Sequence, residues 1–172
     1  KNVFALVDSD KKYPKAQIGK TSNDLIKAFE QFGYTDNLLV GSFHEIENLV
    51  PLEVYFQIAR PGQKQALKFL EFCSEKMPES YLYYDFKKGF SYGEIFENKN
   101  ELASYWIEMF ENFECSKLKI TLNERNSKNK LLNGIGVLFS HALVHMENEF
   151  TLATRNTDLL NEWQKIGGWL AS

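Results

Sequence analysis

The chain has 172 residues, of which 44% are hydrophobic, 15% aromatic and 25% charged, and its formal net charge is −3. This length suits one compact domain, or one domain with a helical appendage, and the composition excludes a disordered chain. The weakly acidic net charge does not indicate a nucleic-acid-binding surface, although a bound cation can supply positive charge where a phosphate binds. The sequence has no apolar run of about 18 residues and no secretory signal, so we expect a soluble, cytoplasmic protein without a membrane partner.

A strand, a helix and a second strand are predicted at the start of the chain. Residues 3–7 form a continuous apolar run, which is typical of a strand buried on both faces of a parallel sheet. Thr21 or Ser22 is expected to cap a helix that Gly33 closes. Residues 38–43 then form a second buried strand. These elements make a right-handed βαβ unit with parallel strands, so the expected fold class is α/β.

The pattern changes between Pro51 and Pro61, where the α/β start gives way to amphipathic segments with helical spacing. We therefore expect residues 1–55 to belong to an α/β domain and residues 56–172 to form a mainly helical extension packed on it. The extension is predicted to have helices at residues 63–76, 100–113, 131–147 and 158–170, and strands at residues 81–86 and 118–122. Cys73 lies in the first of these helices, and we expect it to be a reduced thiol.

Two pairs of carboxylates follow the two predicted strands of the α/β start. Asp8 and Asp10 come directly after the first strand. Glu45 and Glu47 have the same i, i+2 spacing after the second, and in a continuing strand that spacing places both side chains on one face. Because parallel strands end at one edge of the sheet, where α/β folds bind ligands, the four side chains should converge. Their mutual repulsion predicts a bound cation, and oxygen ligands favour Mg²⁺ or Mn²⁺; an ordinary turn is the alternative for an isolated DxD.

The stretch FALVDSDKKYP, followed after the predicted helix and second strand by HEIENLVP, resembles Toprim domains. It is most similar to those of the overcoming-lysogenization-defect (OLD) nucleases and related bacterial anti-phage effectors, in which an acidic residue in an IEN-like turn follows the DxD strand. The resemblance covers residues 2–52 and implies an α/β domain that binds Mg²⁺ and cuts or rejoins nucleic-acid phosphodiesters. It implies that Asp8 and Asp10 match the DxD of the family, and that Glu47 matches its later acidic residue.

One part of the Toprim pattern is missing from the sequence. Toprim domains have an earlier strand that ends in a glutamate acting as metal ligand or general acid–base, and this sequence starts too late to contain it. We therefore expect residues 1–55 to be the C-terminal half of a Toprim-like domain with an incomplete site. An upstream segment or another chain would supply the glutamate, or this copy is inactive.

Further candidates lie outside the acidic pairs. Asp85-Phe86-Lys87 has the D-x-K order of restriction-type nucleases, in which a lysine stabilises charge on the phosphate, so Lys87 is a catalytic candidate and Lys88 its alternative. A solvated hairpin is the competing interpretation. His44 adjoins the acidic cluster, where it would relay a proton, bind phosphate or make a structural hydrogen bond.

Two groups of residues have weaker signals. His141, His145 and Glu149 share one face of a predicted helix with spacing suited to Zn²⁺, or they belong to an ordinary helix face. A basic stretch directly after the DxD would meet a nucleic-acid backbone or remain solvated, and consists of Lys11, Lys12, Lys15 and Lys20.

These observations predict a metal-dependent endonuclease that acts on DNA or RNA, in bacterial anti-phage defence or DNA processing. The predicted catalytic residues are Asp8, Asp10, Glu47 and Lys87, and the predicted Mg²⁺ or Mn²⁺ ligands are Asp8, Asp10, Glu45 and Glu47. The expected partners are a nucleic-acid substrate and a protein such as an ATPase or another subunit. The alternatives are a non-catalytic, degenerate Toprim module that docks a partner, and a fragment of a DxD-containing glycosyltransferase.

Overall fold

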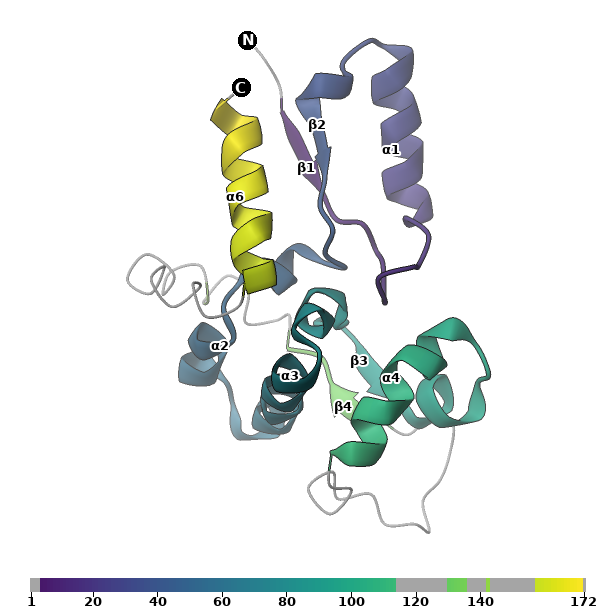
Figure 1. Ribbon diagram of the computed structural model, residues 1–172, viewed down its shortest axis with the longest axis vertical. Coiled ribbons are helices and arrows are strands. Elements are labelled where there is room, and N and C mark those ends of the chain that lie inside the picture. The colour runs from purple at the N-terminus through teal and green to yellow at the C-terminus, as the bar shows by residue number, and fades with distance from the viewer. Residues whose placement is uncertain (1–3, 114–129, 136–141, 143–156, 172) are drawn as a thin grey trace.

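The computed structural model describes residues 4–113, 130–135, 142 and 157–171, which form a mixed α/β molecule that is mostly helical (Figure 1). Its longer helices are α1 (Lys20–Gln31), α2 (Leu52–Ile58), α3 (Lys64–Lys76), α4 (Glu101–Asn112) and α6 (Thr157–Ala171). Its short helices are η1 (Thr35–Asn37), η2 (Ile46–Leu49), η3 (Pro61–Gln63), η4 (Pro78–Tyr83) and η5 (Gly93–Glu97). Its strands are β1 (Ala5–Val7), β2 (Leu38–Val40), β3 (Gly89–Ser91) and β4 (Lys130–Asn133). Among the described residues, no helix combines the length and apolarity that crossing a membrane requires.

The predicted βαβ unit is confirmed. β1 and β2 are parallel neighbours, with Ala5 opposite Leu38 and Val7 opposite Val40, and α1 connects them. In Figure 1 the two strands lie between α1 and α6. The side chains of both strands are only half-buried, so the burial on both faces that their apolar runs predicted is not reached.

The ends of α1 are only partly as expected. The helix begins at Lys20 after Gly19, and Ser22 does not cap it; the Ser22 hydroxyl instead donates to the backbone oxygen of Asp8 at 2.7 Å. A long-range contact therefore competes successfully with local capping. Gly33 does close the helix, because its φ of 72° lies in the left-handed region that glycine adopts without strain.

Helix α6 joins the start of the chain to the remainder. Its Trp163 indole N–H donates to the Leu49 oxygen at 2.9 Å, and its Trp169 indole N–H donates to the Asp36 oxygen at 2.9 Å. Trp169 also meets the Phe4 ring edge-to-face at 5.3 Å. The predicted helix at residues 158–170 is thus confirmed, and it packs against the segments on either side of β2.

The main core is aromatic and lies between α3, α4 and β3. Phe69 of α3 stacks on Phe110 of α4 with ring centroids 4.3 Å apart, and Phe90 lies 4.9 Å from Trp106. All four side chains are fully buried. The helices predicted at residues 63–76 and 100–113 are therefore confirmed, because their apolar faces meet here.

Two predicted elements are wrong. The strand expected at residues 81–86 is replaced by η4 and the turn that follows it, and the strand β3 begins only at Gly89. An apolar run buried on all sides does not distinguish a strand from a buried helical turn. The helix expected at residues 131–147 starts instead as β4, which pairs antiparallel with β3, so Lys130 and Leu132 lie in a sheet.

Most of the rest of the helix predicted at residues 131–147 falls outside the described part of the chain. Residues 136–141 and 143–147 lie outside the described residues, as does the strand predicted at residues 118–122. At Gly134, which follows β4, an added Cβ would come within 2.1 Å of the Lys87 backbone oxygen. This close approach places the end of β4 directly against the turn that carries Lys87.

Candidate functional site

The chain continues from β1 and β2 in two segments that run side by side. The Gly41 N–H donates to the Val7 oxygen at 3.0 Å, and the Ser9 N–H donates to the Phe43 oxygen at 3.1 Å. The Ser9 hydroxyl also donates to the Phe43 oxygen. These bonds carry Asp8 to the same edge as the segment after β2, the edge at which a parallel pair presents its ligands.

Asp8 is half-buried and electrostatically strained. Burial is the largest influence on its carboxyl and raises the pKa above the ordinary value. The charges of Glu47 and Asp10 raise that pKa further, whereas Lys87 and the Ile46 N–H, which donates to the carboxylate, lower it. The net result is a raised pKa, so ionised Asp8 lacks enough positive charge around it.

Glu45 and Glu47 are both buried and both face Lys87. The Lys87 ammonium lies 3.5 Å from Glu45 Oε1 and 3.6 Å from Glu47 Oε2, and the Lys87 N–H donates to Glu45 Oε2 at 3.0 Å. Burial lowers the pKa of Lys87, but Glu45, Glu47 and Asp8 together raise it above its ordinary value. Glu47 Oε2 is buried and accepts no hydrogen bond from the described part of the chain. Two predicted ligands therefore pair with one lysine, and the charge of the third, Asp8, also acts on it.

Asp10 departs from the strand geometry that the sequence analysis assumed. Its N–H donates to the His44 oxygen at 3.1 Å, but its φ of 58° is left-handed, so the extended backbone does not continue through it. The side chain is exposed and lies over Gly19, where an added Cβ would come within 2.2 Å of Asp10 Oδ2. Asp10 therefore lies beside the start of α1, with its charge still felt by Asp8.

Asn48 holds the acidic segment in place. Its amide group donates to the backbone oxygens of Tyr81 at 2.7 Å and Tyr84 at 3.0 Å, and its Oδ1 accepts the Glu45 N–H at 2.7 Å. The side chain is fully buried. No local sequence pattern reveals this role, because the two distant partners of Asn48 lie in η4 and just after it.

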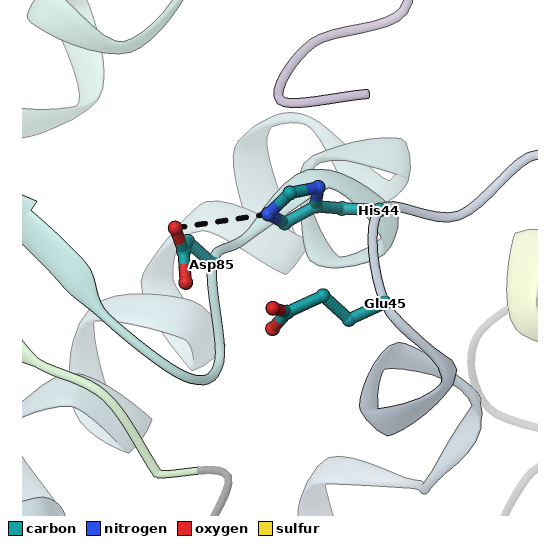
Figure 2. Close-up of side chains that lie close together, drawn as sticks. All are labelled: His44, Glu45 and Asp85. Atoms are coloured by element: carbon teal, nitrogen blue, oxygen red, sulfur yellow. Dashed lines mark ion pairs between the residues drawn. The ribbon is translucent and has the colours of Figure 1, made fainter. Parts of the chain in front are cut away.

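A second cluster, absent from the sequence prediction, contains His44, Glu45 and Asp85. All three are buried, and one ligand atom from each lies within 4.8 Å of the others. Figure 2 shows the three side chains pointing toward one another, with His44 Nε2 3.7 Å from Asp85 Oδ2. The sequence signals were present but separate, since His44 adjoins the acidic pair and Asp85 belongs to the D-x-K triplet.

Asp85 is held as a carboxylate. Burial alone would raise its pKa, but His44, the Lys88 N–H and the Lys12 ammonium outweigh burial and hold the pKa well below the usual range. The Lys88 N–H donates to Oδ1 at 2.6 Å, and Lys12 Nζ donates to Oδ2 at 3.0 Å. Glu45 behaves oppositely: burial and the neighbouring Asp85 charge raise its pKa.

The basic stretch after the DxD is fixed in part by α4. The Trp106 indole N–H donates to the Lys12 oxygen at 2.9 Å, and the Tyr13 hydroxyl donates to Glu101 at 2.8 Å. Lys12 thus faces Asp85 and not solvent alone, whereas Lys15 is exposed. The predicted zinc-binding face made by His141, His145 and Glu149 lies outside the described residues.

The acidic site has the chemistry that a hard divalent cation requires. Its donors are carboxylate oxygens, Asp8 and Glu45 have raised pKa values, and Glu47 Oε2 is buried without a hydrogen bond. A divalent cation would relieve the repulsion among these groups and satisfy the unbonded oxygen. Asp8, Glu45 and Glu47 thus offer the type of oxygen donor that Mg²⁺ or Mn²⁺ prefers. Within the described part of the chain, however, the three potential ligand residues whose donor atoms lie close together are His44, Glu45 and Asp85.

No family model matches the chain, and no curated protein or solved structure matches it. A function for the chain therefore has to be inferred from its own side chains.

Proposed function

We propose that the chain carries the cation-binding part of a metal-dependent, Toprim-type nuclease site. The observation that carries the proposal is the pairing of Glu45 and Glu47 with Lys87, close enough to Asp8 for the charges to interact, at the carboxyl ends of two parallel strands. Structural ion pairs also form such clusters, but three carboxylates around one lysine leave excess negative charge at the position where α/β folds bind ligands.

The βαβ start of the chain supports the Toprim assignment. The DxD follows β1, and Glu47 lies in η2, which comes soon after β2. Two strands that the sequence separates by α1 thus present their acids at one edge, as the resemblance requires. The remaining helices are the part of the molecule for which the resemblance gives no role.

Each residue has a distinct task in the proposed site. A bound Mg²⁺ or Mn²⁺ would supply Lewis acidity toward a phosphodiester and lower the pKa of an attacking water. Asp8 and Glu47 hold that cation, with Glu45 and Asp10 as additional oxygen donors. Lys87, whose side chain is 52% exposed, neutralises the acids and donates to a phosphate oxygen of the substrate.

Replacement of Asp8 by asparagine tests the nuclease proposal. We expect Asp8→Asn to abolish Mg²⁺- or Mn²⁺-dependent nicking of plasmid DNA, because the amide cannot replace an anionic ligand. The same change removes a carboxylate whose pKa is raised in the folded state. We therefore expect the variant to unfold at a higher urea concentration than the wild type at neutral pH.

The matched control is Asp24→Asn, which removes an exposed acid from α1. It should change neither the cleavage rate nor the metal requirement. Undiminished, metal-dependent cutting by Asp8→Asn would reject the proposed role of Asp8, and equal losses in both variants would show a non-specific effect of charge.

A protein-docking role is the second candidate, and exposed apolar side chains at the end of α1 favour it. Phe32 is 68% exposed, and Tyr34 is 61% exposed. Metal binding separates the two functions, because a cation that binds only the folded state stabilises it by about 2.7 kcal/mol at 100 times its dissociation constant. The nuclease proposal expects a rise in melting temperature with Mg²⁺ or Mn²⁺, measured by calorimetry. If the chain only docks a protein partner, the metal should not raise the melting temperature.

A further inference from the structure

The cluster of His44, Glu45 and Asp85 contains an unusual histidine. Its side chain is only 6% exposed, yet neither ring nitrogen has a hydrogen-bond partner within the described structure. Asp85 Oδ2 lies 3.7 Å from Nε2, beyond hydrogen-bonding distance. A buried polar group without a partner costs free energy unless another ligand satisfies it.

The ring is aimed at two carboxylates. In Figure 2, His44 Nε2 points toward Asp85, and the Glu45 carboxylate approaches the same space from the next residue of the chain. We propose that His44, Glu45 and Asp85 form a binding site for a divalent transition metal such as Zn²⁺ or Mn²⁺. The site goes beyond the proposed nuclease function, which does not use His44 or Asp85.

The donor set selects a transition metal over Mg²⁺. Imidazole is a good ligand for Zn²⁺ and other transition metals, whereas Mg²⁺ prefers oxygen ligands and retains its waters. Ligand atoms around one such ion lie about 3–4 Å apart, given bonds of about 2.1 Å. The three atoms lie within 4.8 Å of one another, so a contraction of about 1 Å would bring them around one ion.

Lys12 pairs with the Asp85 oxygen that the proposed cation would need. Its ammonium lies 3.0 Å from Asp85 Oδ2, and its side chain is 30% exposed, so it can swing into solvent. The Lys88 N–H binds the other Asp85 oxygen, and the Lys87 N–H binds Glu45 Oε2. These two backbone bonds orient the carboxylates, and Asp85 Oδ2 faces the ring. Metal binding therefore competes with Lys12.

The test is calorimetric titration of the whole chain with Zn²⁺, together with the visible absorption of bound Co²⁺ as a report on its ligands. We expect wild type to bind one Zn²⁺ at this site, and His44→Gln to weaken that binding at least about tenfold. Lys12→Gln should tighten it several-fold, because the competing ammonium is gone. Mg²⁺-induced stabilisation should persist in His44→Gln, since Asp8 and Glu47 are unchanged.

The other histidines provide the matched control. The double variant His141→Gln/His145→Gln leaves the proposed site intact and should bind Zn²⁺ as wild type does. The proposal is overturned if wild type binds no Zn²⁺, or if binding survives His44→Gln and disappears in the double variant. If circular dichroism shows that His44→Gln is unfolded, the Lys12→Gln variant provides the test instead. Unchanged or weaker Zn²⁺ binding by Lys12→Gln then overturns the proposal.

Failure of this proposal is distinguishable from failure of the nuclease proposal. Asp8→Asn should lose Mg²⁺-dependent cleavage and keep Zn²⁺ binding, whereas His44→Gln should lose Zn²⁺ binding and keep stabilisation by Mg²⁺. Glu45 is shared by the two sites, so its variants are not used to separate them.

Discussion

Replacing Asn48 with alanine should lower the free energy of unfolding by about 3–5 kcal/mol, because it would leave three buried backbone groups without hydrogen-bond partners. These are the Glu45 N–H and the oxygens of Tyr81 and Tyr84, each of which now pairs with the Asn48 amide. Water cannot replace the side chain easily, since the residue is fully buried. Urea unfolding followed by circular dichroism measures the loss.

Two further variants sharpen this test. Asn48→Asp keeps an acceptor for the Glu45 N–H but loses both donors, so it should also destabilise the protein by more than 1 kcal/mol. Asn23→Ala removes an exposed asparagine from α1 and should change stability by less than about 0.5 kcal/mol. A loss below 1 kcal/mol for Asn48→Ala would show that the three bonds are not limiting for the fold.

Replacing Lys87 with methionine should reduce the proposed cleavage by about 100- to 1,000-fold while tightening Mg²⁺ binding. The lysine is the cation that Glu45, Glu47 and Asp8 share, so its removal leaves three acids for the metal alone. Its contribution to the transition state disappears at the same time. Steady-state plasmid cleavage at saturating metal, with calorimetric titration of Mg²⁺, measures both effects.

Lys88→Met is the matched control for this change, because Lys88 is the exposed neighbour whose backbone N–H, and not its ammonium, holds Asp85. It should leave cleavage within about threefold of wild type. A Lys87→Met protein that cleaves normally would exclude Lys87 from the reaction. Weaker Mg²⁺ binding in that variant would mean that the lysine organises the acids and does not compete with the cation.

The Lys87→Met protein should also show a defined dependence of stability on pH. Without the ammonium, the pKa values of Asp8 and Glu45, already raised by burial, rise further in the folded state. Above the ordinary carboxyl pKa the folded state then binds more protons than the unfolded state, so stability falls as pH rises. We expect the destabilisation at neutral pH to diminish as the pH is lowered toward the raised pKa values.

Apolar runs and the periodic spacing of apolar residues were sufficient to predict the helices and strands that local sequence determines. The apolar run before Asp8 and the run beginning at Leu38 are the parallel pair, and the spacing of apolar residues located α3, α4 and α6. The placement of acids at the carboxyl edge followed from the parallel connection of those strands.

Contacts between distant segments account for what the sequence analysis missed. Asn48 looks like an ordinary turn residue until η4 supplies its partners, and Asp85 looks solvated until Lys12 and His44 approach it. Asp10 was assigned to a continuing strand, but its left-handed backbone turns the side chain onto Gly19. Each of these outcomes depends on tertiary packing, which no local pattern encodes.

The groups of the two proposed metal sites are brought together by closing large loops of chain. Lys87 meets Glu45 across 42 positions, and Lys12 meets Asp85 across 73. Non-local contacts of this kind form late, because the entropy of loop closure must be overcome before they contribute. A nascent or partly opened chain would therefore offer no pocket to a cation, so that metal capture in the cell would mark the molecules that have completed folding.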